Sequence, residues 1–109
     1  MKEDTNNVNV VEDVTLLLVS GSKGKKEDDK QYVKKLSNAI LQVFYKHNSV
    51  KLRCVGAAAI NNAIKSYIIA DGEAQKRGDN FRIKPSFTTV RFKDEQKTGI
   101  LFEVSSLNK

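Results

Sequence analysis

The chain is poor in residues that form covalent or metal cross-links. Its 109 residues include one cysteine, one histidine, one proline and no tryptophan. The single cysteine, Cys54, excludes an internal disulfide. One histidine and one cysteine cannot supply the four ligands of a zinc finger. We therefore expect no metal site and no cofactor, and we predict that Cys54 is a reduced residue of the core.

Long apolar runs are also absent. No segment approaches the ~20 consecutive apolar residues that a membrane-spanning helix needs. The first residues show no apolar signal region. We therefore expect no membrane partner and a location in the cytoplasm, or in nucleus and cytoplasm if the source is eukaryotic. The usage of asparagine and lysine hints at an AT-rich eukaryotic genome, such as that of an apicomplexan parasite.

The charge of the chain is positive. Nineteen lysines and arginines stand against thirteen aspartates and glutamates, which gives a net charge of +6. A positive field concentrates phosphates and favours a nucleic-acid partner, although many soluble domains are mildly basic without one. The length suits one domain. We expect a flexible N-terminal arm over 1–12, a domain over 13–104 and a polar tail over 105–109.

Apolar periodicity in the first half predicts a strand followed by a helix. Residues 14–20 are apolar on both faces, which is typical of a central strand or of a strand buried in a dimer. After a glycine-containing loop, Asp28 is a suitable helix cap with Gln31 three residues on. The helix is predicted to end near 46–49. Its apolar face consists of Val33, Leu36, Ile40, Val43 and Phe44.

A second strand and helix follow. Val50–Cys54 alternates apolar and basic residues, as a half-exposed strand does. Gly56 ends this strand, and a helix is predicted from Ala57 to about Ala70, with its continuation past Gly72 left open. The positions expected to point inward are Ile60, Ala63, Ile64, Tyr67 and Ile68.

The last third predicts a hairpin. In 81–92 the apolar residues change parity, which predicts a bulge near Thr88 and Thr89. Pro85 lacks a donor for the strand ladder and so needs an edge strand or a bulge. Residues 93–99 are expected to be a polar turn, followed by a strand over 100–104. The order β-α-β-α-β-β predicts a two-layer α+β fold, a four-stranded mixed sheet with two helices on one face.

The stretch from Arg53 to Lys65 is the most informative motif. A short apolar strand leads to a lone glycine and then to a helix of small residues with two adjacent amides. This pattern resembles the Alba superfamily, which includes archaeal chromatin proteins and the stage V protein S group of bacterial sporulation proteins. The sporulation branch is nearest in motif, and the likeness covers residues 13–104. It implies the Alba fold, shared with the C-terminal domain of initiation factor 3.

The resemblance also implies a function and a set of contact residues. Alba proteins are dimers that bind DNA and RNA largely without sequence preference, in chromatin organisation or RNA regulation. Their contacts come from the loop after the first strand and from the last hairpin. The corresponding residues here are Lys23, Lys25, Lys26, Arg91, Lys93 and Lys97, and Gly56 is added on the physical ground given below. The implied protein partners are a second copy, other Alba proteins and a sirtuin-type deacetylase acting on acetylated Lys23.

Elementary chemistry agrees with a role for Gly56 at such a surface. The first turn of a helix has unpaired N–H groups, and alanines at 57–59 cannot cap them, so this helix start could hold a phosphate. The alternative is that small residues simply allow close packing. Similarly, Phe87 and Phe92 could pack at a dimer interface or stack on bases.

The motif departs from the archaeal pattern beside the glycine. Val55 and Ala57 stand where archaeal members have arginines, and residues 27–29 are acidic. This departure favours an alternative function, a protein-interaction or assembly factor of the sporulation type with little nucleic-acid affinity. In that case Asn61 and Asn62 would face a protein partner.

Enzymatic activity is not expected. The loop after the first strand resembles a phosphate-binding P-loop only in part, because Val19 replaces its first glycine and Lys26 replaces its serine or threonine. A lysine could form a Schiff base at an abasic site and cleave the strand, but this stays a minor alternative. Borohydride trapping on abasic DNA tests it.

Overall fold

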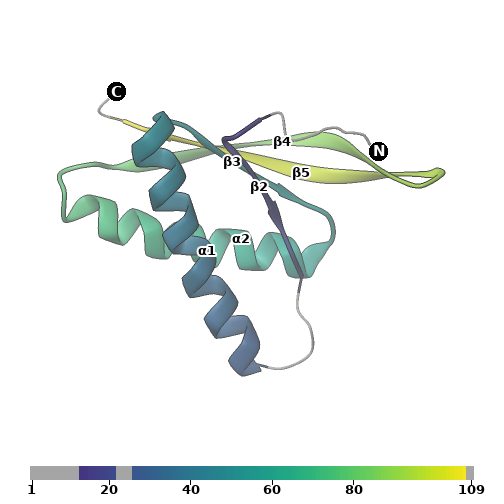
Figure 1. The fold of residues 1–109 in the computed structure, drawn as a ribbon, viewed down its shortest axis with the longest axis horizontal. Coiled ribbons are helices and arrows are strands. Elements are labelled where there is room, and N and C mark those ends of the chain that lie inside the picture. Colours follow the sequence, from purple (N-terminus) through teal and green to yellow (C-terminus); the bar gives the residue numbers. More distant parts are fainter. Residues whose placement is uncertain (1–12, 22–25, 108–109) are drawn as a thin grey trace.

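The structure is a computed structural model that describes residues 13–21 and 26–107, with side chains from 29 onward in the second range. The elements follow in the order β2 (Leu16–Val19), α1 (Lys26–His47), β3 (Val50–Cys54), α2 (Ala57–Gln75), β4 (Phe81–Phe92) and β5 (Glu95–Ser106). The predicted order and the two-layer α+β fold are confirmed. Figure 1 shows the two helices crossing on one side of the sheet, with the β4–β5 hairpin extending well past them.

The four strands lie in the order β2-β3-β5-β4. β2 is parallel to β3, β3 is antiparallel to β5, and β4 is antiparallel to β5. The edge strands are thus β2 and β4. Pro85 lies in the edge strand β4, as its missing donor requires.

Four details of the strands and helices differ from expectation. β2 is an edge strand and not a central one, and Leu18 on it is 62% exposed. β4 has no bulge at Thr88 and Thr89, because its register with β5 is continuous from Phe81 to Phe92. β5 begins at Glu95, so most of the expected polar turn is strand. α1 begins at Lys26, two residues before the predicted start.

The parity change that suggested a bulge has another cause. Phe81 and Ile83 lie on the face of β4 that packs on the helices. Val90 lies on the opposite face and is buried outside the main core. The first half of β4 therefore buries apolar side chains on the face toward the helices. The second half extends past the helices, and its buried residue lies on the other face.

The core lies between the helices and one face of the sheet. α1 contributes the apolar face that its sequence predicted, and α2 packs through small residues such as Ala59, Ala63 and Ala70. Because the buried positions of α2 are small, its isoleucines lie toward the sides, and Ile68, expected inward, is 59% exposed. Cys54 is fully buried, and burial raises the pKa of its thiol to about 11, so that thiol stays protonated at neutral pH.

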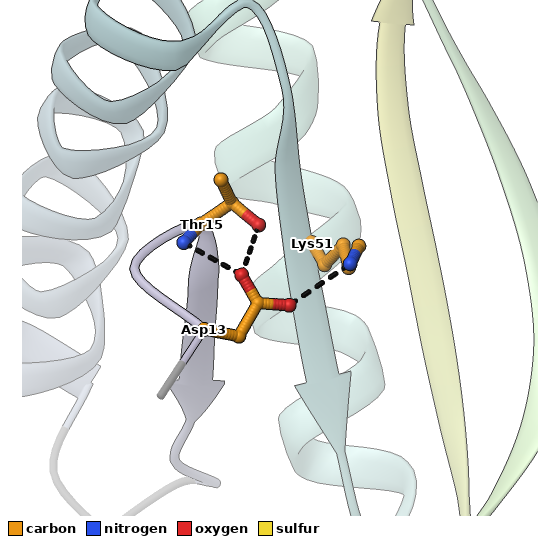
Figure 2. Close-up of polar contacts among 3 residues, drawn as sticks. All are labelled: Asp13, Thr15 and Lys51. Carbon is orange, nitrogen blue, oxygen red and sulfur yellow. Dashed lines mark hydrogen bonds and ion pairs between the residues drawn. The ribbon is translucent and has the colours of Figure 1, made fainter. Parts of the chain in front are cut away.

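The start of β2 is fastened to β3 by a small polar cluster. The Asp13 carboxylate accepts hydrogen bonds from the backbone N–H of Thr15 at 2.9 Å and from its hydroxyl at 2.5 Å, and pairs with Lys51 Nζ at 2.9 Å (Figure 2). The hydroxyl of Thr15, followed by Lys51, lowers the pKa of Asp13 to about 2. This cluster holds the edge strand in register on the exposed face of the sheet.

The low pKa predicts an acid-sensitive contribution from Asp13. The pKa of Asp13 in the folded chain, about 2, lies below the ordinary aspartate value of 3.8, so its contribution to stability is present above pH 3.8 and is lost as the pH falls toward about 2. We expect the stability advantage of the wild type over Asp13→Asn to shrink across this window. Urea unfolding of both proteins at a series of pH values measures it. Two curves that stay parallel from pH 5 to about 2 would contradict the assignment.

Candidate functional site

The turn that precedes α2 exposes backbone groups. Gly56 has φ 93° and ψ 157°, a conformation that favours glycine, and no side chain caps the helix. Its carbonyl accepts the N–H of Ile60 at 3.1 Å, which closes the first helical turn. Gly56, Ala57 and Ala58 are all exposed. No side-chain cap satisfies the N–H groups of this turn, and the residues at its start are exposed.

The residues that follow β2 are held against the same turn. The Asn62 side chain donates to the carbonyl of Ser20 at 3.0 Å, and the N–H of Ser20 donates to the hydroxyl of Tyr32 at 2.8 Å. A Cβ on Gly21 would lie 3.2 Å from the Cβ of Ala58. Asn62 is therefore largely buried and bonded within the chain. Asn61 is exposed.

The hairpin also meets this turn. A Cβ on Gly99 would lie only 2.6 Å from the carbonyl oxygen of Cys54 and 3.2 Å from Val55 Cγ2. Only glycine permits β5 to approach the end of β3 so closely. Three segments that are distant in sequence, the end of β2, the start of α2 and the hairpin, thus converge around Gly56.

The predicted basic contacts are only partly described. Lys23 and Lys25, and with them the proposed acetylation site, lie outside the described residues, and Lys26 is the first residue of α1. Arg91, Lys93 and Lys97 are exposed on the hairpin, and the Lys97 ammonium lies 5.6 Å from the centre of the Phe92 ring.

The register shows how the hairpin cations are arranged. Arg91 pairs with Gln96, whereas Lys97 pairs with Val90. Because directly opposite residues share a face and neighbours alternate, Arg91 and Lys97 lie on opposite faces of the ribbon. Lys93 lies in the two-residue turn between the strands, with φ 53°. The hairpin therefore presents cations on both sides and not on one common surface.

A second feature lies on the outer side of the helices. The N-terminal half of α1 extends past α2 where the two helices cross (Figure 1). Between them is a cavity of about 590 Å³, here called the α1–α2 groove. Its apolar lining comes from Val33, Ala58 and Ile69, and its cations are Lys30, Lys34 and Lys65. Asp29 and Asn61 also line it.

The chain matches a known protein family over most of its length. Residues 28–107 match the model of the stage V sporulation protein S (SpoVS) family. The chain belongs to the SpoVS family. This family has the Alba-like fold, so the resemblance seen in the motif is confirmed at the level of the sporulation branch. The match gives no support for chromatin binding or an apicomplexan source.

Sequence reasoning did not identify the α1–α2 groove. The available signal was the four-residue spacing of Lys30 and Lys34 and of Lys65 and Ile69, which places each pair on one helix face.

Two features are absent from the described part of this SpoVS-family chain. Over residues 13–21 and 26–107, no group of three or more His, Cys, Asp or Glu side chains could hold a metal ion. Within the same ranges, no helix is long and apolar enough to cross a membrane.

Proposed function

We propose that this SpoVS-family protein is a protein-interaction or assembly factor, and that the α1–α2 groove is its binding surface. The groove carries the proposal, because it combines an apolar lining with exposed charged and amide side chains. Binding sites on proteins are commonly concave and apolar with a few polar groups that fix orientation. Membership in a family named for sporulation supports the same reading.

Two observations favour this reading over a nucleic-acid function. The positions beside Gly56 are Val55 and Ala57, so two cations are missing at the turn where three segments converge. On the hairpin, Arg91 and Lys97 lie on opposite faces. An affinity that depends on phosphate contacts grows with the number of cations on one surface.

A pull-down tests the interaction function. Full-length tagged protein is incubated with nuclease-treated extract of its native cells, and retained proteins are compared for wild type, Ile69→Glu and Ile68→Glu. Ile69 lines the groove, whereas Ile68 is its exposed neighbour outside it. We expect Ile69→Glu to lose a partner that Ile68→Glu retains. Loss of all partners on nuclease treatment would contradict the proposal.

The second candidate is a DNA- and RNA-binding function through the hairpin. The net charge of +6 and the exposed Arg91, Lys93 and Lys97 favour it. If each cation neutralises one phosphate, the triple alanine variant should reduce the slope of log K against log salt by about 2 to 3. Salt-titrated gel shifts with duplex DNA and single-stranded RNA measure this slope.

The control for the hairpin experiment is Lys46→Ala. Lys46 is exposed in the last turn of α1. Figure 1 shows this end of α1 away from the tip of the β4–β5 hairpin. The Lys46→Ala variant should have a slope of log K against log salt that lies within about 1 of the wild-type slope. A hairpin variant with the wild-type slope, or binding that does not depend on salt, would remove the hairpin from the function.

A further inference from the structure

The chemistry of the α1–α2 groove identifies the kind of partner it fits. Its lining has an apolar part formed by Val33, Ala58 and Ile69. Ile69 is 42% exposed although it is a large apolar residue. Apolar side chains gathered in a cavity between two helices are suited to receive apolar side chains of another molecule. The cavity is large enough for a few side chains of a partner helix and too small for a folded domain.

The charges around this apolar lining have mostly one sign. Lys30 and Lys34 come from α1 and Lys65 comes from α2, and all three are exposed. Among the lining residues whose side chains the structure describes, Asp29 is the only acidic one. Across an interface, charges of opposite sign guide encounter and select partners. The groove therefore favours a partner that is acidic as well as apolar.

A polypeptide fits these features better than a nucleic acid does. Binding of single strands relies on bases stacked on aromatic rings, and none of the described residues that line the groove is aromatic. An amphipathic helix satisfies both parts of the groove, because its apolar and acidic side chains recur at helical spacing.

We propose that the α1–α2 groove binds an acidic amphipathic helix of a partner protein. The apolar side chains of the partner helix lie on Val33, Ala58 and Ile69, and the carboxylates of that helix face Lys30, Lys34 and Lys65. This assignment rests on the proposed interaction function and gives it a partner of defined chemistry.

A defined peptide tests the assignment without a known partner. The probe is a fluorescein-labelled helical peptide of about 14 residues, or four turns, with leucine at apolar positions and glutamate elsewhere. A second peptide has lysine in place of each glutamate. Fluorescence anisotropy with the full chain measures both dissociation constants, and amide chemical shifts map the contact. We expect the acidic peptide to bind at least about tenfold more tightly and to shift resonances of Lys34 and Lys65.

Matched variants separate the groove from general surface effects. Ile69→Glu should weaken the acidic peptide about tenfold or more, whereas Ile68→Glu should change it less than about twofold. Lys34→Glu with Lys65→Glu should reverse the preference toward the lysine peptide. Lys35→Glu, on an exposed position of α1 outside the groove, should not reverse it. All five residues are exposed, so the variants should fold, and thermal unfolding verifies this.

Each remaining outcome has a defined meaning. Equal affinity for both peptides, or no binding at millimolar concentration, overturns the assignment of an acidic helix. If single-stranded RNA displaces the acidic peptide, and Ile69→Glu weakens RNA binding as it weakens peptide binding, the ligand of the groove is a nucleic acid and not an acidic helix. If the peptide fails to bind while Ile69→Glu still loses a partner from extract, the interaction function stands and only the chemistry of the partner is wrong.

Discussion

Gly99→Ala is expected to lower the free energy of unfolding by about 2 to 3 kcal/mol, because the added methyl group has no space. Its Cβ would lie 2.6 Å from the carbonyl oxygen of Cys54, a backbone atom that cannot rotate away. To relieve the contact, β5 must move away from β3 and from the turn at Gly56. In a domain of this size the loss corresponds to a melting temperature lower by about 10 to 20 °C.

The measurement is urea or thermal unfolding of the variant beside a matched glycine. Gly72→Ala places the same methyl group inside α2, where nothing lies within 4 Å of its Cβ. Alanine is the better helix former, so this control should gain about 0.5 to 1 kcal/mol. If the two variants changed stability in the same direction, the close approach of β5 would not be a constraint. Gly99→Ala should also alter the hairpin, and amide spectra report whether the change reaches Gly56.

Phe44→Ala should have the largest effect of any single substitution named here, a loss of about 3 to 5 kcal/mol. The Phe44 side chain is fully buried between α1 and the sheet. Its ring centre lies 4.6 Å from that of Phe81 and 5.4 Å from that of Tyr45. Truncation removes these contacts and leaves a cavity that the neighbouring elements cannot fill without moving.

Against a typical domain stability of about 5 to 15 kcal/mol, such a loss leaves Phe44→Ala marginally folded at room temperature. Phe44→Leu is the control, since it keeps most of the apolar volume and should cost clearly less. Chemical unfolding of both variants gives the two free energies. A loss below about 1 kcal/mol for Phe44→Ala would show that the core between α1 and β4 is not packed as described.

Both substitutions also test how the fold positions its sites. Phe44 contacts Phe81 at the start of β4, while Gly99 holds β5 near the start of α2. The first anchors the base of the hairpin to α1 and the second anchors its middle to the Gly56 turn. Both substitutions should loosen the hairpin. If the hairpin binds nucleic acid, they should weaken that binding more than they weaken peptide binding in the α1–α2 groove.

The sequence alone determined the order and type of the elements. Apolar periodicity on α1, alternation in β3 and the glycine before α2 are local patterns, and each depends on the preference of one short segment. The local motif around Gly56 was also sufficient to indicate the family branch. These features can be predicted from the sequence because a helix face or a strand face is formed by residues that are close in the chain.

Only the tertiary structure decided which faces are covered. Ile68 is apolar and was expected inside, yet it is exposed, because α2 packs through its alanines. The first strand was expected to be central or buried in a dimer; within the chain it lies at an edge, and its Leu18 is exposed. Asn62 is buried within the chain and donates to the carbonyl of Ser20. The α1–α2 groove joins Lys34 to Lys65 across two helices, and the crossing of those helices is set by packing of the whole core. Burial and proximity depend on contacts between distant segments, which no local pattern contains.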